Sequence, residues 1–589
     1  MSVHAYTRGA SFLLNRTGAA DVFTPGDFTP EQRMFAKAAR DFVEREVFPV
    51  SDRIEEKEAG LMAALIRKAG ALGLLAADIP EAYGGLGLDK TTSALIFENL
   101  AGQGSFLVVF GGQVGIGCLP IVYYGSHETR LKYLPSIADG TKIGCFALTE
   151  PAAGSDAMAC RTKAVLSGDG RHYVLNGTKQ FITSAGIADI FIVFAKVDGA
   201  GLTGFVLERD TPGLSIGPEE QKMGLHGTST TTVLLDDAKV PIENVLGELG
   251  RGHKIAFNIL NIGRFKIGSS AVGACKLALG HALSYCLERK QFGKRLVEFG
   301  AIREKLGEMF ARTYAAEAVA YRTVGLIDRL LQQRDLSEEA SLRSIEEYAV
   351  ECAMVKVIGS ETLDYVADEA MQCFGGYGYC ADYPLERFYR DSRVNRIFEG
   401  TNEINRQLIP TMALRKGASG EIPLHEALER AGVAPSDPVP VAEDGPLAQE
   451  GAAVERLKEL CLFSIGLAVR RHGKALAGEQ ALVSRLADLM MAVYRAESTL
   501  LRALKDARGV GPGAVRLASA AARIVCEDAV ERGEALARQV LSSTETGEEI
   551  PRALAVVRRL TERVPADTLA LRETIAARLV ELERLPSEG

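Results

Sequence analysis

The chain has 589 residues, of which 47% are hydrophobic and 24% charged, and its formal net charge is -8. This length exceeds what a single hydrophobic core organises and predicts several domains. The composition is typical of a soluble globular protein, and its acidic balance excludes a basic surface for nucleic acid.

The cysteines and histidines give no sign of a metal or disulfide framework. Ten cysteines and eight histidines are scattered along the chain, without a CxxC pair or an HExxH motif. We therefore expect reduced thiols and no metal centre.

The N-terminal residues and the longest apolar run bear on localisation. Arg8 and Arg16 without a nearby acid are a weak sign of a transit peptide, but the apolar run 12–14 is too short for a secretory signal. The run LCLFSIGLAV is about half of what a spanning helix requires. We expect a cytoplasmic protein without a transmembrane segment, with membrane contact at most peripheral.

The first half of the chain changes from helical to β patterns. After an N-terminal arm of residues 1–28, residues 29–145 have helical periodicity, and Thr29 and Pro30 are placed to cap and open the first helix. Apolar residues at 35, 38, 39, 42 and 43 share one face of it. Residues 146–248 contain runs such as YVLNGTKQFITS and IADIFIVFAKV between Gly, Asn and Asp turns, which predict a compact β domain.

Helical patterns return in the second half. Residues 249–415 contain long helical runs that predict an antiparallel bundle. Residues 416–450 are rich in Pro, Gly and Ala and indicate a partly extended linker. Residues 451–589 form an extra helical domain suited to core packing by default, or to dimer or membrane contacts. The expected fold class is mainly α with a central β domain.

Two segments at the joins could contact a large planar cofactor in a cleft between domains. In CFALTEPAAGSD, Thr149, Gly154 and Ser155 could offer hydroxyl and N–H groups to a ring edge or phosphate, although a plain β turn is the favoured interpretation of this segment alone. In LERKQFGKR, cations beside Phe292 suit a diphosphate and an adenine, although a solvated basic helix end is favoured in isolation.

A third segment contains GGYG, whose glycines relax steric limits at a helix end, and the stretch RIFEGTNEINR. Glu399 follows Ile397 and Phe398, so partial desolvation should raise its pKa and suit it as a base toward a weakly acidic carbon. The alternative is a charge at the N-terminus of a helix that begins near Asn402, and position alone favours neither.

Taken in order, seven segments resemble the signature of the acyl-CoA dehydrogenase family: TEPAAGSD, NGTKQFITSAGIADIF, MGLHGTSTTTVLLDDAKVP, NILNIGRF, RKQFGKR, QCFGGYGY and RIFEGTNEI. The resemblance covers about residues 28–414. The extra helical region, together with GASFLL and FTPGDFT, makes the chain similar to the very-long-chain branch and its bacterial relatives. The resemblance implies an N-terminal helical domain, a middle β domain and a C-terminal four-helix domain, with FAD at their junction. It also implies a homodimer, because in that branch the extra region covers the tetramer face.

The resemblance also implies a reaction. Glu399 would remove the α-proton of a saturated acyl-CoA while a β-hydride passes to FAD, giving a trans-2-enoyl-CoA in fatty-acid β-oxidation, with electrons passed on to electron-transferring flavoprotein. The thioester carbonyl would accept hydrogen bonds from the Glu399 backbone N–H and the flavin ribityl chain. Gly263 occupies the position from which another branch supplies its base, so no competitor for the role is present there.

Site residues follow from the same resemblance. The flavin would be bordered by Phe146, Leu148, Thr149, Gly154, Ser155, Phe181 and Thr183. The FAD of the neighbouring subunit would be reached by Arg289, Phe292, Gln372 and Gly376. Pyrophosphate and adenine contacts would be completed by Thr401, Asn402 and Glu403. The acyl-CoA would be contacted by Ser155, Asn261, Arg264, Phe398 and Gly400.

Two departures and two alternatives accompany this assignment. Phe181 stands where many members carry Trp, and Glu403 where shorter-chain members often carry Gln. The run GGQVGIG, residues 111–117, either keeps an acyl channel open or forms a helix packing seam. An acyl-CoA oxidase would share the base and flavin, whereas an assembly or scaffold member would not need the retained Glu399.

Overall fold

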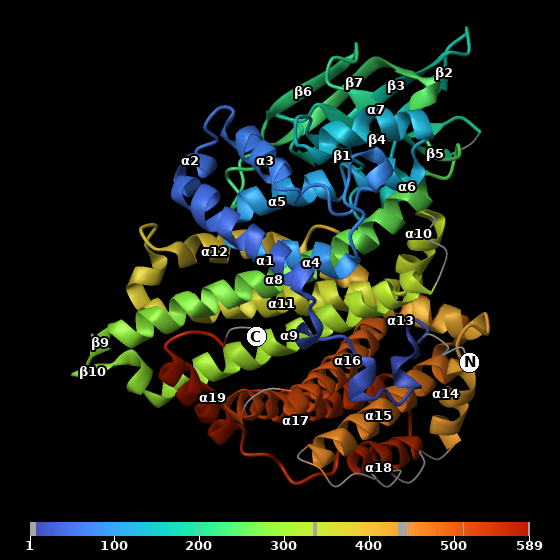
Figure 1. The fold of residues 1–589 in the computed structure, drawn as a ribbon. Helices are drawn as coiled ribbons and strands as arrows, with labels where there is room; N and C mark the ends of the chain where they lie inside the picture. Colours follow the sequence, from blue (N-terminus) through green and yellow to red (C-terminus); the bar gives the residue numbers. More distant parts are fainter. Residues whose placement is uncertain are drawn as a thin grey trace.

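A computed structural model of the protein describes residues 7–199, 201–333, 338–433, 445, 447–509 and 512–586 (Figure 1). The first six residues of the expected arm and much of the expected linker lie outside these ranges. The architecture is mainly helical around one β sheet, which confirms the predicted fold class.

The N-terminal helical region begins as predicted. The N–H of Gln32 donates to Thr29 Oγ1 at 3.1 Å, and Pro30 opens the first helix. The helices of this region are α1 Pro30–Phe42, α2 Ser51–Glu55, α3 Leu61–Ala71, α4 Lys90–Asn99, α5 Gly104–Val114, α6 Leu119–Tyr124 and α7 His127–Ala138.

One stretch of this region, Gly104–Tyr124, is long and apolar enough to cross a membrane by length and composition. It is broken into α5 and α6 by residues 115–118, and 78% of its most apolar window is buried inside the protein. Phe106 and Phe110 are both fully enclosed. The apolar character of this stretch is therefore explained by the core that it builds.

The β domain is one mixed sheet in the order β6-β7-β3-β2-β4-β5-β8, with β1 parallel to β4. Its strands are β1 Gly144–Ala147, β2 Lys163–Leu166, β3 His172–Thr183, β4 Ile190–Val197, β5 Gly201–Glu208, β6 Leu214–Glu219, β7 Thr230–Pro241 and β8 Val245–Leu246. The pairing of β3 with β7 shifts register between Lys179 and Ile182, and Phe181 has φ 58° at that irregularity. Such a bulge re-aims side chains, here in a segment expected to border the flavin.

The helices that follow the sheet are α8 Gly252–Glu288, α9 Gly300–Gln332, α10 Glu338–Glu347, α11 Ala349–Phe374, α12 Pro384–Ser392 and α13 Asn402–Ala418. The central helix α11 packs along α8, α9 and α13. A short hairpin, β9 Lys290–Gln291 and β10 Lys294–Arg295, lies at the far tip of α8 and α9 (Figure 1). The length of α8 therefore places the hairpin, with Phe292, far from Asn261 and Arg264 near the start of the same helix.

The extra helical region consists of α15 Ala448–His472, α16 Gln480–Gly509, α17 Pro512–Thr544, α18 Glu549–Thr561 and α19 Thr568–Leu582. The expected extended linker is partly helical: α13 continues to Ala418, and α14 spans Leu424–Val433. The reason is an apolar stripe with helical spacing, Leu424, Ala427, Leu428 and Ala431, which is buried as α14 packs against α15.

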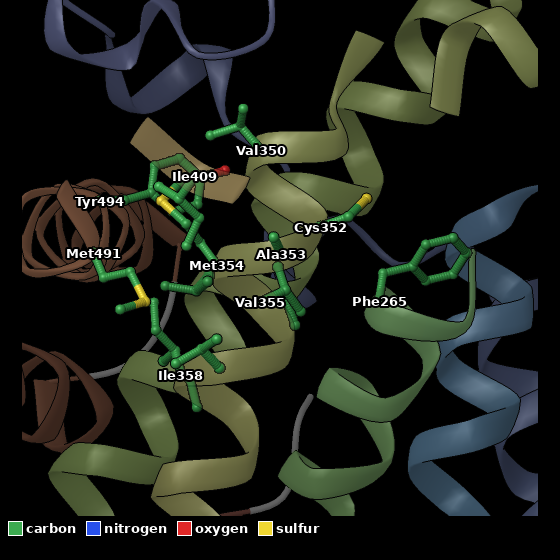
Figure 2. Packing of buried hydrophobic residues seen from close by; sticks show 14 of the residues in the cluster. Phe265, Val350, Cys352, Ala353, Met354, Val355, Ile358, Ile409, Met491 and Tyr494 are labelled. Carbon is green, nitrogen blue, oxygen red and sulfur yellow. The ribbon is translucent and has the colours of Figure 1, made fainter. Parts of the chain in front are cut away.

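The extra helices α15–α19 share one continuous core with the helices α8–α13. Figure 2 shows Met354 and Ile358 of α11 facing Met491 of α16, while Phe265 of α8 lies on the other side of α11. The N-terminal arm joins the same core, since the Phe12 and Tyr494 rings lie 5.0 Å apart. The C-terminal region therefore buttresses the central helix α11 and α13, the helix that follows Glu399 in the chain.

Candidate active site

Glu399 lies in a tight turn between a short 3-10 helix, Arg393–Arg396, and α13. Glu399 has φ 55° and Gly400 has φ 78°, so both adopt the left-handed region that a side chain normally disfavours. This turn directs the carboxylate across to α8. A Cβ atom at Gly263 would lie 2.9 Å from Glu399 Cδ and 3.0 Å from each carboxylate oxygen. The absence of a side chain at Gly263 is what makes room for the carboxylate.

The carboxylate of Glu399 is not used to cap the following helix. That role belongs to Thr401, whose Oγ1 accepts the N–H of Ile404 at 3.2 Å, while Glu403 supplies the acid of the first turn. Glu399 is partly exposed as a residue, but its Oε2 is buried and has no hydrogen-bond partner among the described residues. A buried carboxylate oxygen without a partner indicates a ligand-facing group rather than a structural one.

The electrostatics of Glu399 suit a base. Burial raises its pKa to about 7, while the nearby charges of Arg264 and Lys356 oppose that shift. A carboxylate with this pKa is partly ionised at neutral pH and is far more basic than an exposed glutamate. The predicted rise in pKa is thus confirmed, with burial as its main cause.

Arg264 and Asn261, the residues that the resemblance assigns to acyl-CoA contact, lie on α8 beside this turn. Arg264 Nη1 donates to Asn261 Oδ1 at 2.7 Å, and both side chains are buried. Arg264 Nε is buried and has no hydrogen-bond partner within the described part of the chain, and burial lowers the Arg264 pKa. Phe398 is half-buried next to the base. The structure therefore brings Asn261, Arg264, Phe398, Glu399 and Gly400 together.

Two residues that the sequence analysis did not assign complete the turn. Lys356 of α11 donates from Nζ to Gly400 O at 2.9 Å and to Asn402 Oδ1 at 2.8 Å. Asn405 Nδ2 donates to Gly400 O at 2.8 Å. A lone lysine in the apolar run AMVKVIG was the signal that could have found the first of them.

The flavin-side residues lie on two segments joined by a buried ion pair. Lys179 Nζ lies 2.7 Å from Glu150 Oε1 and donates to Leu148 O at 3.2 Å. The N–H of Gln180 also donates to Thr149 O at 2.9 Å. The pair therefore ties the loop after β1 to β3, each of which carries predicted flavin residues.

The exposure of these residues fits FAD. Leu148 is buried; Phe146, Thr149 and Thr183 are half-buried; and Gly154 and Ser155 are exposed. Phe181 is 61% exposed, an apolar ring on the bulge of β3. A Cβ atom at Gly154 would meet nothing within 4 Å, so its backbone is free to approach a ligand. A planar cofactor and its substrate would cover the exposed ring of Phe181, the accessible backbone at Gly154 and the Oε2 atom of Glu399.

The cofactor residues predicted for the neighbouring subunit's FAD lie far from Glu399 in the same chain, whereas the α13 group directly follows it. At about 1.5 Å per residue, α8 carries Arg289 roughly 37 Å beyond Arg264. Phe292 is 92% exposed on the hairpin that follows, and Gln372 and Gly376 are exposed at the end of α11. Of the α13 group, Thr401 and Glu403 lie at the exposed helix start, whereas the Asn402 side chain points inward to Lys356, Ser360 and Glu361.

A cavity opens between α5, α8, α11 and α12. Most of its wall is apolar, and its lining includes Leu107, Val108, Ala271, Ala274, Leu363 and Phe388. Ser270 and Ala274 also line it, two and three helical turns beyond Gly263 on the same face of α8. The cavity therefore lies along the helix face on which Glu399 rests.

The glycines between residues 111 and 117 were expected either to keep an acyl channel open or to form a helix packing seam, and the structure contains positions of both kinds. A Cβ atom at Gly117 would lie 2.7 Å from the Gly144 backbone, and one at Gly111 would lie 3.2 Å from the Phe97 ring, so both are packing positions. At Gly112, by contrast, a Cβ atom would meet only Ser184 Oγ at 4.0 Å. Gly112 is the member of this run that leaves space open.

Among the described residues, no three His, Cys, Asp or Glu side chains gather into a metal-binding group. All ten cysteines are free.

Comparisons with known proteins show the family to which the chain belongs. Models described as the acyl-CoA dehydrogenase N-terminal, middle and C-terminal domains match residues 29–141, 145–238 and 250–413, and a further C-terminal domain model of the same family matches residues 456–559. The chain belongs to the acyl-CoA dehydrogenase family and is an FAD-dependent enzyme of that class.

Three relatives show how far the similarity extends. A probable acyl-CoA dehydrogenase of Bacillus subtilis is 44% identical over 98% of this chain and 98% of its own. A human very long-chain specific acyl-CoA dehydrogenase is 32% identical over 82% of this chain and 76% of its own. An acyl-CoA dehydrogenase of Bacillus anthracis, solved in complex with FAD, superposes with a TM-score of 0.96 at 45% identity, covering 99% of this chain and 100% of its own.

Proposed function

We propose that Glu399 is the base that removes the α-proton of a long-chain acyl-CoA, so that the enzyme forms a trans-2-enoyl-CoA in fatty-acid β-oxidation. The observation that carries this proposal is the buried, unpartnered Oε2 of Glu399 held against Gly263. We further propose a cytoplasmic homodimer that passes its electrons to electron-transferring flavoprotein.

The groups around Glu399 are suited to this chemistry. An α-proton of a thioester is weakly acidic, and a carboxylate with a pKa near 7 is matched to removing it near neutral pH. The Glu399 backbone N–H lies in the same fixed turn and is available to the thioester oxygen, where developing charge needs a preorganised donor. FAD, when bound, accepts the β-hydride. The buried Arg264 and Asn261 hold the α8 side of the site.

The cavity supports a long acyl chain. From Gly263 to Ala274, α8 advances roughly 16 Å at about 1.5 Å per residue, a distance that only a long extended chain would span. Its wall is mostly apolar, as an alkyl chain requires.

The exposed aromatic tip supports the homodimer. Phe292 and Tyr379 are 92% and 87% exposed, and large apolar side chains at such exposure indicate a surface that a partner covers. The family resemblance places the partner's FAD against Arg289 and Phe292. A second copy would therefore complete the cofactor site.

The test is anaerobic reduction of the bound flavin by saturated acyl-CoAs from butanoyl to eicosanoyl. Long chains should bleach the parent and a Glu248→Gln control, which removes an exposed carboxylate. Glu399→Gln should retain FAD yet fail to bleach. Failure of every acyl-CoA with the parent, or parent-like reduction of Glu399→Gln, would overturn the assignment and favour a scaffold role.

The acceptor is tested separately by comparing turnover with oxygen and with electron-transferring flavoprotein. Faster turnover with the flavoprotein is expected, because a closed apolar site shields the reduced flavin. Faster turnover with oxygen would identify an acyl-CoA oxidase.

A further inference from the structure

Lys356 is a fully buried cation in the middle of α11, with 0% of its surface exposed. Its neighbours Val355 and Val357 are also buried, and α11 is packed on one side by α8 and on the other by α16 (Figure 2). A lysine is rarely enclosed in this way, because removing its charge from water is costly unless its donors are satisfied. The position of Lys356 therefore calls for a specific explanation.

The donors of Lys356 reach the turn that carries Glu399. Its Nζ donates to the Gly400 carbonyl at 2.9 Å and to Asn402 Oδ1 at 2.8 Å. Both acceptors are neutral oxygens, and both belong to the chain immediately after Glu399. Lys356 thus links the centre of α11 to this turn.

The turn itself requires such support. Glu399 at φ 55° and Gly400 at φ 78° are two successive residues in the left-handed region. Glycine adopts this conformation readily, but for Glu399 it is a source of backbone strain. The Gly400 carbonyl accepts a second hydrogen bond from Asn405 Nδ2 at 2.8 Å. Asn405 is also fully buried. The Gly400 carbonyl is therefore clamped from α11 and from α13, which fixes the peptide plane after the base.

The charge of Lys356 acts on the same residue. Burial lowers the pKa of Lys356 to about 8, and the negative charge of Glu399 offsets part of that shift. The ammonium is therefore still charged at neutral pH, where it opposes the burial that raises the Glu399 pKa. Removing this cation should make Glu399 hold its proton more tightly.

We propose that Lys356 is a positioning residue for the reaction: it holds the Gly400 carbonyl so that the Glu399 carboxylate stays against Gly263 and the Glu399 N–H keeps its direction. The inference rests on the proposed role of Glu399 as the base. Lys356 acts through the turn and through its field, and it has no contact role with the substrate.

The test compares Lys356→Met with Lys458→Met, a control that removes an equally buried lysine from the C-terminal region. Lys458 is 3% exposed and donates to Asn15 O at 2.8 Å, far along the chain from the base. Both variants should lose thermal stability. Lys356→Met should in addition lower kcat by about ten- to hundredfold, because a small misplacement of a base is costly. Its kcat/KM inflection should move to higher pH, while KM and FAD content change little. Lys458→Met should keep the parent's kcat and inflection.

A second variant separates the hold on the Gly400 carbonyl from the effect of the Lys356 charge. It also provides a test if Lys356→Met does not fold. Asn405→Leu removes the other donor to the Gly400 carbonyl without removing a charge, so kcat should fall while the kcat/KM inflection stays in place. Parent-like kcat and inflection in Lys356→Met, or parent-like kcat in Asn405→Leu, would overturn the positioning role. If Glu399→Gln is inactive while Lys356→Met keeps the kcat and inflection of the parent, only the positioning role of Lys356 is wrong. If Glu399→Gln is active, the proposed role of Glu399 as the base is itself wrong.

Discussion

The Glu399 carboxylate fills the space into which a side chain at position 263 would project: a Cβ atom on Gly263 would lie 3.0 Å from both carboxylate oxygens. Gly263 lies on α8 and Glu399 in the turn before α13, and their contact defines where the proposed base points. The relationship has a direct consequence for mutants of α8.

Gly263→Ala should displace the carboxylate and lower kcat/KM by roughly a hundredfold, since a shift of about 1 Å in a reacting group has that cost. FAD content should be unchanged. Gly280→Ala is the matched control on the same helix, because a Cβ atom there meets nothing within 4 Å, and the helix should gain slightly in stability. Equal activity of the two variants would show that the carboxylate does not depend on the space at Gly263.

The activity should depend on pH through Glu399. Burial raises its pKa to about 7, and only the ionised form can accept a proton. The kcat/KM value should therefore be highest above pH 7 and fall about tenfold per pH unit below it, since kcat/KM reports the free enzyme. Initial rates from pH 5.5 to 8.5, with thermal stability measured over the same range, provide the check. A flat profile in a stably folded enzyme would contradict this expectation.

Chain-length preference should change when the cavity is filled. Ala274→Phe places a ring in the cavity wall three turns beyond Gly263. Oxidation of hexadecanoyl-CoA should fall much more than oxidation of butanoyl-CoA, because only the longer chain reaches that wall. The control is Ala274→Ser, which changes the side-chain volume little and should retain the chain-length preference of the parent. Equal losses for both substrates in Ala274→Phe would place the acyl chain elsewhere.

Flavin retention should depend on the ion pair between Lys179 and Glu150. Lys179→Met leaves Glu150 with its hydrogen bonds from Thr162 but without a cation, and it frees β3 from the loop that follows β1. We expect the purified variant to contain less FAD and to regain it only at higher added FAD. Absorbance at the flavin band after gel filtration measures this. Lys163→Met, which alters an exposed lysine of β2, should retain FAD like the parent.

Stability should depend on a buried carboxylate between two lysines. Asp78 accepts hydrogen bonds from Lys90 Nζ at 2.6 Å and Lys266 Nζ at 2.7 Å. Burial disfavours the charge of Asp78, but the two ammonium groups outweigh it and hold its pKa well below the usual range. Asp78→Asn leaves both cations without a counter-charge and should cost about 3–5 kcal/mol of unfolding free energy.

Denaturant unfolding of Asp78→Asn, beside Asp41→Asn at an exposed pair with Lys37, would measure this cost. The sign with pH follows from the depressed pKa: the contribution of Asp78 is present above its unfolded pKa of about 4 and is lost as the pH falls through the lower folded value. Similar stability of the two variants would mean that the buried triad is not a net stabiliser.

Several elements were predictable because their determinants are local. The cap at Thr29, the β character of the run YVLNGTKQFITS and the end of α11 before the glycines of GGYG depend on neighbouring residues, and the structure places them as expected. The helix α14 was missed because its Pro- and Ala-rich surroundings suggested a linker, whereas burial of Leu424 and Leu428 against α15 stabilises it. Local propensity alone cannot report such tertiary burial.

By itself, the sequence determined the order of the domains and the family signature, because both rest on residue types and spacings along the chain. The resemblance carried by that signature named Glu399 as the candidate base, which its position alone left open. Only the tertiary structure decided that the Glu399 carboxylate meets Gly263, that Lys356 and Asn405 hold the Gly400 carbonyl, and that Arg289 lies at the far end of α8. These relationships depend on how separate helices pack, which fixes the direction of each side chain and the dielectric around each charge.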